Sequence, residues 1–558
     1  MIYLKIQETI NQNGTIEVSN NTERYDQDSY TYAGTYTYKA QKVPASLSGG
    51  APVETVYFNY YTPRTSVFRP GTVTATKDGV STITNYQYHP TIIAPNIITS
   101  TNSDGKITEK NISYTIDHPS ILIKNNLGFE NRIAIPFEST TYVNGNPLDG
   151  TRTTFAYFDT NGKNPDEIFQ SGGIIRPYKT WRFERTWTNG QLGSGVWNIQ
   201  EYFDSYTYDG MLETWHKPHW NEETYTYDKR LLTSKSYLGF TKSYLYYPNS
   251  SLPQTITDAD GTTQNITYDG LTRTKTVTDV CKDITTTYDY HFTTGANDKN
   301  YVKTTTDYPS PDANSQLNIL ENYVYKDGLG RIIATIRKHQ APNSANDDII
   351  TSIEYDKYGR IDKNYEPQLL SSNSGAYEKP QGNWKFTQNT FYPSPLNRIH
   401  TVTPPDWFAT TYEYSANEVA DGITIDSTNT IYGDNQLFKQ TIIDGNTHKS
   451  ITFTDKKGRN ILSRRTNNGE ISSINYDTKN IFDDKDRKVY TLPPKTNINQ
   501  KDLLFFCEYD REDRKVREYI PGKAEIRYYF NRQDLLVAKR DGYILQHPDH
   551  RYYVYHYD

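Results

Sequence analysis

The heptapeptide YKDGLGR, at residues 325–331, has the composition of a sharp turn between two β-strands. Asp327 suits the first position of a turn because its carboxylate accepts hydrogen bonds from nearby backbone N–H groups, and Gly330 tolerates a left-handed backbone. The segment IIATIRKH, at residues 332–339, follows with a β-rich, partly alternating pattern of apolar and polar residues. The stretch therefore predicts a hairpin of strand, turn and strand.

The same skeleton recurs along the chain as an aromatic residue, an acid, two spacers, a small or polar residue and often Arg. The acids of the clear copies lie about 19 to 29 residues apart, and FNRQDL at 530–535 is a decayed copy. We expect each Arg to pair with the acid of its own or a neighbouring turn, which sets register more than stability. The repeated turn residues are Asp209, Asp228, Asp269, Arg273, Asp327, Gly330, Arg331, Asp356, Gly359, Arg360, Asp455, Gly458, Arg459, Asp483, Arg487, Asp510 and Arg514.

A single hairpin of this size cannot bury a hydrophobic face, so neighbouring hairpins must supply the missing contacts. The chain contains 50 Tyr, and its hydrophobic fraction is 35%, below the roughly 45–50% that is usual for globular domains. Tyr buries its ring and still offers a hydroxyl to water. The sequence therefore predicts an all-β protein whose stacked hairpins form a thin continuous sheet that is wetted on both sides.

Four regions follow from the spacing of the motif. Residues 1–200 read as degenerate hairpin repeats, with a separate domain as the alternative, and residues 201–364 hold clear repeats. Residues 365–450 are rich in Pro and predict an irregular excursion with one short helix at 384–390. Residues 451–558 resume the repeat, and the final Tyr-Asp resembles the opening of a repeat that does not complete, so we expect a fragment or a split gene product.

Charge and cysteine content exclude several classes of protein. The net charge is −6 with both signs interspersed, which gives no nucleic-acid footprint. Cys281 and Cys507 are far apart and lack a CxxC pattern, so we expect free thiols. The sequence shows no signal peptide and no apolar run of membrane-spanning length. Export would then use another route, or the natural N-terminus lies elsewhere.

The motif WHKPHW is a candidate metal or sugar site, because it places His216 and His219 between Trp215 and Trp220. Its HxxH spacing is not the helical HExxH arrangement, and no third ligand is evident. Structural histidines are the favoured interpretation. We likewise expect the two Trp side chains to pack against a neighbouring hairpin rather than stack on a carbohydrate.

Two acidic pairs, Asp347 with Asp348 and Asp483 with Asp484, are candidate acid/base dyads or calcium ligands. Nothing in the sequence brings them to a pocket, so solvated turn acids are the default interpretation. The chain has no nucleophile motif or phosphate loop. The sequence therefore predicts no catalytic residue, no metal and no cofactor, and the turn residues serve as structural markers.

The series of Tyr-Asp-x-x-Gly-Arg copies resembles the YD repeats of the Rhs family, which are shared with teneurins and the C components of insecticidal Tc toxin complexes. A narrower pattern is similar to Rhs-repeat proteins of Bacteroidota. Its motifs occur in the order DGLGR, YDKYGR, YEP (365–367), SGAY (374–377), FYPSPLNRI (391–399), FTDKKGRNILSR (453–464), LPP (492–494), CEYD (507–510) and IPG (520–522).

This resemblance implies a β-sheet strip that spirals into a partial hollow shell, which in secreted bacterial relatives encloses a variable C-terminal toxin. The chain departs from toxin-bearing relatives because it lacks a DPxG-like autoproteolytic motif. The expected function is a non-enzymatic scaffold that encloses or presents a toxin or effector encoded beyond this chain, with that domain or a remaining shell segment as partner. We expect it to be secreted or on the cell surface.

Two alternatives stay open from the sequence. One is a secreted surface adhesion or glycan-binding protein, because Tyr and Trp are abundant. The other is a client captured on a secretion machine, whose components would then be partners. No nucleic acid is expected as a partner in any of the three cases.

Overall fold

The computed structural model describes the strands at residues 2–8, 19–26, 35–42 and 54–61. It also describes residues 71–558 except 121–131, 160–161, 165–173, 189–190, 294–298, 310–318, 343–346, 371–372, 426–429, 467–475, 524, 543–551 and 558. The described elements are antiparallel strands and three single-turn 3-10 helices, η1 (Thr115–Asp117), η3 (Val419–Asp421) and η5 (Lys501–Leu503). The prediction of an all-β protein is confirmed.

A small sheet precedes the main one and contains β1 (Ile2–Glu8), β2 (Ser19–Asp26), β3 (Thr35–Lys42) and β4 (Glu54–Tyr61), in that order. The main sheet begins with β5 (Thr72–Lys77), β6 (Val80–Tyr88), β7 (Pro95–Thr101), β8 (Ile107–Tyr114), β9 (Pro136–Val143), β10 (Asn146–Asp159), β11 (Gly162–Asn164), β12 (Ile174–Thr188), β13 (Gln191–Tyr206) and β14 (Leu212–His216).

The main sheet continues with β15 (Glu223–Asp228), β16 (Leu231–Tyr237), β17 (Phe240–Tyr246), β18 (Pro253–Thr257), β19 (Thr263–Tyr268), β20 (Thr274–Asp279), β21 (Ile284–His291), β22 (Asn300–Asp307), β23 (Ile319–Lys326), β24 (Ile332–Lys338), β25 (Asp348–Tyr355), β26 (Ile361–Tyr365), β27 (Gln368–Leu370) and β28 (Phe386–Phe391). It ends with β29 (Ile399–Thr403), β30 (Thr410–Ala416), β31 (Phe438–Ile443), β32 (Lys449–Thr454), β33 (Asn460–Thr466), β34 (Asp477–Phe482), β35 (Lys488–Leu492), β36 (Phe505–Tyr509), β37 (Lys515–Tyr519), β38 (Ile526–Phe530), β39 (Leu536–Arg540) and β40 (Tyr553–Val554).

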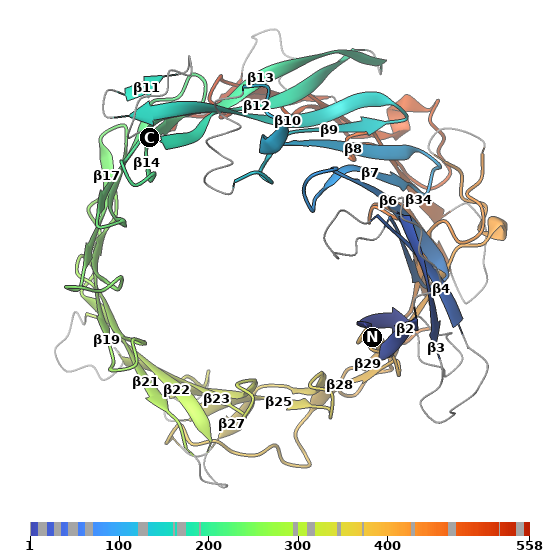
Figure 1. The fold of residues 1–558 in the computed structure, drawn as a ribbon. Helices are drawn as coiled ribbons and strands as arrows, with labels where there is room; N and C mark the ends of the chain where they lie inside the picture. Colours follow the sequence, from blue (N-terminus) through green and yellow to red (C-terminus); the bar gives the residue numbers. More distant parts are fainter. Residues whose placement is uncertain are drawn as a thin grey trace.

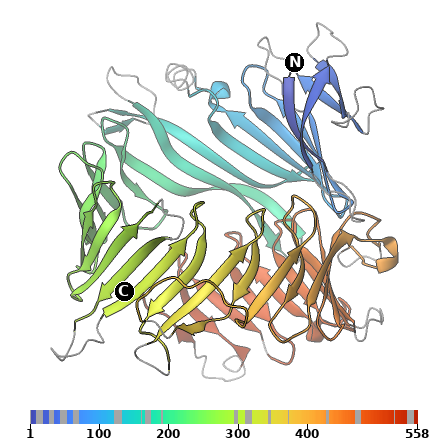
Figure 2. The same ribbon diagram turned by 90° about the horizontal axis from the view of Figure 1, so that it is seen from below.

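The main sheet is a strip of sequential hairpins that curves into a ring (Figure 1), as the sequence and the resemblance predicted. Strands pair with their neighbours along the chain, with two local detours: β10 pairs directly with β12, and β25 pairs with both β26 and β27. Figure 2 shows that the strip also rises as it turns, so that strands β5–β13 lie in an upper tier above the yellow-to-red strands of a lower tier. The result is a partial hollow shell.

The wall is thin from β14 to the start of β23. Between residues 201 and 322 no described residue is buried. Side chains on these strands instead pair across the sheet through hydroxyl groups, as when Thr267 and Thr276 meet at 2.6 Å and Thr278 and Thr285 at 3.0 Å. Such cross-strand pairs each stabilise a sheet by a fraction of a kcal/mol, roughly 0.2–1.

Buried clusters form where loops of the Pro-rich segment cover the sheet. The loop before β28 packs Trp384 on a cluster with Ile336 and Ile350, and Tyr325 donates its hydroxyl proton to the carbonyl of Gly375 at 2.6 Å. A second loop, at 417–437, carries Ile423, Tyr432 and Leu437 into a cluster with Phe453 and Ile461. These two loops give the lower tier a local hydrophobic core.

The predicted excursion at 365–450 needs correction, because the segment also contributes strands β27 to β31 to the sheet. The short helix expected at 384–390 is wrong. Phe386, Thr387 and Phe391 favour a strand, and β28 pairs with β26 through Tyr365 and Phe386. The irregular backbone is confined to the connections between these strands.

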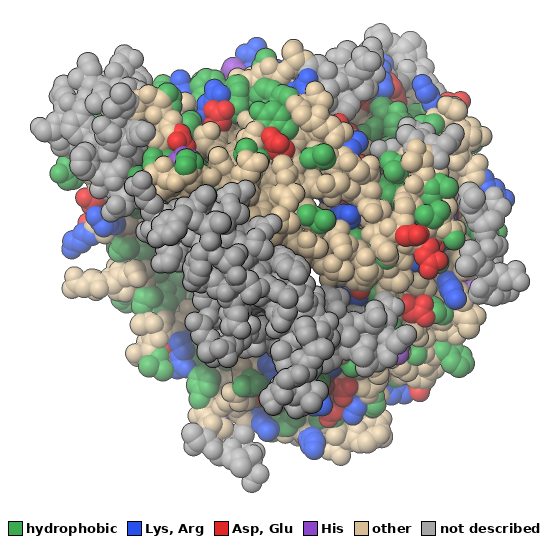
Figure 3. Space-filling model, turned by 45° about the vertical axis from the view of Figure 1, so that its right-hand side comes forward, with side chains coloured by type: hydrophobic (Ala, Val, Ile, Leu, Met, Phe, Trp, Pro, Cys, Tyr) green, Lys and Arg blue, Asp and Glu red, His purple; other side chains and the backbone are tan. Residues whose placement is uncertain are grey.

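The surface carries both signs of charge. On the face shown in Figure 3, Lys and Arg side chains alternate with Asp and Glu, and neither sign gathers into a patch on the atoms that are coloured. Cys281 and Cys507 are free thiols in the structure. Among the described residues, no helix has the length and apolarity needed to cross a membrane.

Candidate functional site

The repeated turn is a compact unit in which one backbone hydrogen bond closes the turn and one carboxylate accepts three more. In the turn of YKDGLGR, the backbone N–H of Asp327 donates to the carbonyl of Arg331 at 2.9 Å. Oδ1 of Asp327 accepts from the backbone N–H groups of Leu329 and Arg331, each at 2.9 Å, and Oδ2 accepts from Nε of Arg331 at 2.7 Å. The acid therefore closes the turn and fixes the guanidinium at once.

The same carboxylate and guanidinium geometry recurs in turns that start at Asp269, Asp356, Asp455, Asp483 and Asp510, with Nε to Oδ2 distances of 2.6 to 2.7 Å. The fourth residue of each turn is left-handed. It is glycine at Gly330, Gly359 and Gly458, and it is Asp486 or Asp513 in the later turns. The exception is the turn of Asp269, where the β-branched Thr272 takes the left-handed position. Gly and Asp tolerate this conformation better than other residues, which explains the sequence pattern.

The aromatic residue of each repeat joins one hairpin to the previous one. The guanidinium of Arg331 lies over the ring of Tyr355 at 4.5 Å, and the Tyr355 hydroxyl donates to the carbonyl of Ile332 at 2.8 Å. Arg487 and Tyr509 repeat this arrangement, with the ring at 4.9 Å. Where this aromatic residue is Tyr, it makes both a cation–π contact and a hydrogen bond to the preceding hairpin, which sets the register of the strip. Phe482 and Phe530 make the cation–π contact alone.

Two of the acids predicted from the sequence do not occupy the first position of a repeated turn. Asp209 lies third in a turn that begins at Thr207, whose hydroxyl accepts from the N–H of Met211 at 3.0 Å. Asp228 ends β15 beside a two-residue turn. Two turns with the same backbone hydrogen bonds went unrecognised, at Asp258 and Asp444, although in the first the N–H of Thr262 donates to the carboxylate of Asp260 rather than to that of Asp258. Both lack Arg at the fifth position. A search for the acid and a Gly three places later would have found the Asp258 turn through Gly261, whereas the Asp444 turn has Thr447 at that place.

Electrostatics in the exposed turns favour the charged acid. The Arg273 side chain, through its hydrogen bond, holds the pKa of Asp269 below its usual value. Burial acts to raise the pKa of Asp327, but the hydrogen bonds from Arg331 outweigh it and the pKa is lowered. The same balance lowers the pKa of Asp356. These acids therefore stay ionised as structural anchors.

The turns of the lower tier meet those of the upper tier along a line that we call the seam. Arg398 pairs with Asp78, and their side chains are only 8% and 6% exposed. Oγ of Ser103 donates to the carbonyl of Gln436 at 2.7 Å and accepts from the N–H of Lys456 at 2.9 Å. These contacts join residues more than 300 positions apart and hold one tier on the other.

Further along the seam the contacts are ionic. Nζ of Lys106 lies 2.7 Å from Oδ1 of Asp484, and Arg182 of β12 pairs with Asp513. The lower turns are also tied to one another, because each Arg reaches the left-handed acid of the next turn. Arg459 contacts Asp486 at 2.8 Å, Arg487 contacts Asp513 at 2.6 Å and Arg514 contacts Asp534 at 2.5 Å. No sequence signal marks the upper-tier partners of the seam.

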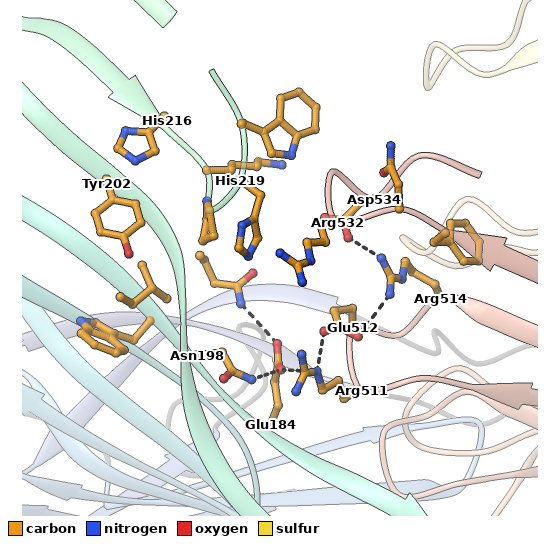
Figure 4. Close-up of a pocket in the computed structure, with 18 of the residues that line it drawn as sticks. Glu184, Asn198, Tyr202, His216, His219, Arg511, Glu512, Arg514, Arg532 and Asp534 are labelled. Atoms are coloured by element: carbon orange, nitrogen blue, oxygen red, sulfur yellow. Dashed lines mark hydrogen bonds and ion pairs between the residues drawn. The ribbon is translucent and has the colours of Figure 1, made fainter. Parts of the chain in front are cut away.

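A cavity of about 950 Å³ opens on the seam between strands β12–β14 and the turns at 510–514 and 531–535 (Figure 4). Its aromatic lining includes Trp181, Trp197, Tyr202, Trp220 and Phe530. Charged groups complete it, with Glu184, Glu512 and Asp534 beside Lys217, Arg511, Arg514 and Arg532. It combines residues of β12–β14 and the loop after β14 with residues of the turns near the end of the strip.

The motif WHKPHW lies at this cavity, but no group of three metal-ligating side chains occurs among the described residues. Nδ1 of His216 lies 2.6 Å from Asp204, and its ring stacks on Tyr202 at 4.6 Å. The backbone carbonyl of His219 accepts from Gln533 at 3.4 Å. His216 is therefore held by protein groups, and the backbone of His219 takes part in the seam.

The two tryptophans of the motif contact neighbouring hairpins. Nε1 of Trp215 donates to the Tyr225 hydroxyl at 2.9 Å, and Trp220 lies 6.0 Å from the Tyr237 ring. This is the packing that the sequence favoured, although Trp220 also lines the cavity.

The acidic pairs have structural roles. Asp348 is fully buried, which corrects its interpretation as a solvated acid. Its carboxylate accepts hydrogen bonds from the backbone N–H groups of His339 at 3.0 Å and Gly375 at 2.8 Å. These bonds anchor the loop that covers β25. Asp483 closes a repeated turn, and Asp484 pairs with Lys106 across the seam.

Comparisons with known proteins agree with the geometry of the shell. A family model described as a domain of unknown function, DUF6443, matches residues 297–419, and a comparison with curated proteins gives no match. Among 41 matching solved chains is TcdB2-TccC3 without its hypervariable C-terminal region, with a TM-score of 0.59, 12% identity, and coverage of 91% of this chain and 32% of that one.

Two further structures are similar. TcdB2-TccC3-TEV matches with a TM-score of 0.55 and 12% identity over 93% of this chain and 32% of that one, and TcdB2-TccC3-Cdc42 with 0.55 and 13% over 91% and 33%. The chain therefore spans about a third of the length of these Tc toxin structures. At this identity the likeness shows the fold alone, an Rhs-like β-shell.

Proposed function

We propose that this chain is a non-enzymatic wall segment of an Rhs-type shell that encloses or presents a toxin or effector polypeptide outside its 558 residues. The main observation behind this proposal is the seam, because its contacts hold the two tiers of the curved strip together as one wall. Sequential pairing leaves few free strand edges, which keeps an unfolded guest from adding to the sheet. The likeness to the TcdB2-TccC3 shell supports this role.

The thin wall also suits a container. Between residues 201 and 322 no described residue is buried, so both faces are wetted and bear Tyr and Thr side chains. A polar wall offers little hydrophobic surface to trap a guest irreversibly, while it excludes proteases by size. Placement outside the cell, by secretion or at the surface, is part of the proposal.

Limited proteolysis tests the proposal. The chain is co-expressed with the polypeptide encoded beside it, purified, and digested next to that polypeptide alone. We expect fragments of the guest to survive in the complex at protease concentrations that destroy the free guest. Asp78→Asn, which removes a charge from the seam, should shorten that protection, and Arg230→Gln, on an exposed turn, should not. Equal digestion of the free and co-expressed guest would sink the proposal.

A further inference from the structure

The cavity on the seam holds cationic groups that the protein itself does not neutralise. Among the described residues, the Arg532 side chain has no ion-pair or hydrogen-bond partner, and the Lys217 ammonium forms no ion pair and lies 5.4 Å from the centre of the Trp220 ring. The His219 ring, which also lines the cavity, has no hydrogen-bond partner among these residues. In Figure 4 the side chains of His219 and Arg532 point into the space between the two ribbons. The indole Nε1 of Trp181, which also lines the cavity, is buried without a hydrogen-bond partner. The site therefore has spare donors and positive charge.

The same cavity offers acceptors that are fixed in place. Glu184 is 1% exposed, and its carboxylate accepts from Asn198 at 2.6 Å and Gln200 at 3.2 Å, with Arg511 at 3.9 Å. Glu512 is held by Arg511 at 2.6 Å. Planar amides and carboxylates fixed by such networks suit hydroxyl groups, which donate and accept hydrogen bonds together.

Aromatic rings complete the lining. Trp181, Trp197, Tyr202 and Trp220 come from the upper tier and Phe530 from the lower one. Rings of this kind provide flat apolar surface beside polar groups, and binding sites typically combine such surface with a few well-placed polar groups. A ligand that has both apolar faces and many hydroxyls fits this mixture, and a carboxylate on it would meet Arg532.

An extended polypeptide fits less well. It would bind best by adding to an unpaired strand edge, but β12 is paired on both sides by β10 and β13, and β13 is paired by β12 and β14. The lower-tier turns that face the cavity use their backbone groups within the turn, as when the N–H of Asp510 donates to Arg514 at 2.9 Å. The cavity therefore offers side chains rather than backbone.

We propose that this cavity binds an acidic oligosaccharide, with the sugar carboxylate on Arg532 and the hydroxyls on the network of Glu184. About 950 Å³ is room for a short oligosaccharide. The site is complete only when the two tiers meet, because His219 and Trp220 come from one tier and Arg532 from the other. This inference concerns a ligand of the wall and stands whether or not the shell holds a guest.

Calorimetric titration of the whole chain with trigalacturonate tests the inference. We expect saturable binding that weakens with added salt. The methyl ester of the same sugar, which lacks the charge, should bind about tenfold more weakly, as should trigalacturonate with Arg532→Gln, since each change removes one charge-assisted hydrogen bond. His219→Asn, which keeps a residue that tolerates the left-handed backbone of this position (φ 66°), should also weaken binding.

Arg230→Gln is the matched control, because Arg230 is an exposed turn arginine outside the cavity, and it should leave affinity unchanged. Thermal melting checks that each variant is folded. No saturable binding of trigalacturonate, or equal affinity with Arg532→Gln, would overturn the inference. Tighter binding of triglutamate than of the sugar would overturn the carbohydrate assignment and point to an acidic polypeptide.

Discussion

The same turn occurs in two environments within one sheet. The turns of Asp269, Asp327 and Asp356, which we call the open rim, keep their carboxylates partly exposed. On the seam, the turns of Asp455 and Asp483 contact the upper tier through Lys456 and Asp484. The local bonds are nearly identical, since Nε of Arg331 lies 2.7 Å from Asp327 and Nε of Arg459 lies 2.6 Å from Asp455. The burial of the two acids differs, because the Asp327 side chain is 21% exposed and that of Asp455 is 1% exposed.

This difference separates what the motif does from what its surroundings do. The acid closes the turn and orients the guanidinium wherever it stands, so the hairpin is a local product of the sequence. On the seam the same ion pair is shielded from water, so removing one of its partners costs more free energy. The later turns also carry acids at the left-handed position, and these acids extend the ion-pair network. Energetic importance therefore varies along a series of almost equal motifs.

The largest effect is expected where the tiers are fastened by a buried pair. Asp78→Asn keeps a residue that tolerates the left-handed backbone of this position (φ 54°). It leaves the guanidinium of Arg398 without its anion, and removing one partner of a buried pair costs about 3–5 kcal/mol. Hydrogen exchange should quicken in β5, β6, β29 and β30 and stay unchanged in β19–β22 of the open wall. An equal increase in exchange rate in all of these strands, or no increase in any of them, would contradict the role of this pair in holding the tiers together.

A direct test of the comparison sets Asp455→Asn against Asp327→Asn. Asn still accepts the two backbone bonds through its one oxygen, so each change removes the charge and the acceptor oxygen that face Arg. On the seam this should cost about 3 kcal/mol, because Arg459 is 13% exposed and Asp455 is buried. On the open rim the loss should stay below about 1 kcal/mol. The opening free energies of β33 and β24, from native-state hydrogen exchange, give the two values, and equal losses would show that burial is irrelevant.

The part of the structure that sequence predicted is the part that local chemistry decides. The spacing of acid, left-handed residue and Arg predicts hairpins, and the fifty Tyr predict a thin wall, so the all-β shell was within reach. Asp258 and Asp444 were missed because they lack both the aromatic residue before the acid and the Arg after the turn. The register link from Tyr355 to Ile332 was not foreseen, although the position of the aromatic residue before each acid carries that signal.

The seam and its cavity were out of reach for a physical reason. Their contacts join Asp78 to Arg398 and Arg182 to Asp513, and a single sequence does not show which turns of a spiral meet after one revolution. The helix expected at 384–390 failed for a related reason, because pairing with β26 decides the conformation of that stretch. Asp348 looked solvated because the loop that buries it arrives 27 residues later, at Gly375.

At the left-handed glycines the two regions should behave alike, with one exception. A Cβ at Gly330 on the open rim, or at Gly458 on the seam, meets no atom within 4 Å. Ala at either position should cost about 1–2 kcal/mol from backbone strain alone. Gly359→Ala should cost more, because its Cβ would lie 2.9 Å from Nη1 of Arg331. Gly359→Asp should cost less than Ala, since it gives Arg331 the kind of acceptor that Asp486 gives Arg459.

Thermal unfolding midpoints order these four variants. A larger loss for Gly458→Ala than for Gly330→Ala would mean that the seam strains its turns, and would break the view that the turn is the same unit in both regions.

The smallest effect concerns acid, where the seam remains in contact with water. Burial acts to raise the pKa of Asp513, but the charge of Lys485 and the hydrogen bond from Arg182 outweigh it, so the pKa is lowered in the folded chain. A depressed pKa stabilises the fold above the unfolded value of about 3.9, and this stabilisation is lost as pH falls through the folded pKa. The melting midpoint should therefore drop below about pH 4. Asp513→Asn, whose left-handed backbone (φ 66°) Asn accepts, should flatten part of that drop. Open-rim acids such as Asp327 also have lowered pKa values, so the melting midpoint alone does not show which acid is responsible. Hydrogen exchange of β12 distinguishes them. Lowering the pH should speed exchange in β12 of the parent chain and should leave the exchange rate of β12 in Asp513→Asn nearly constant.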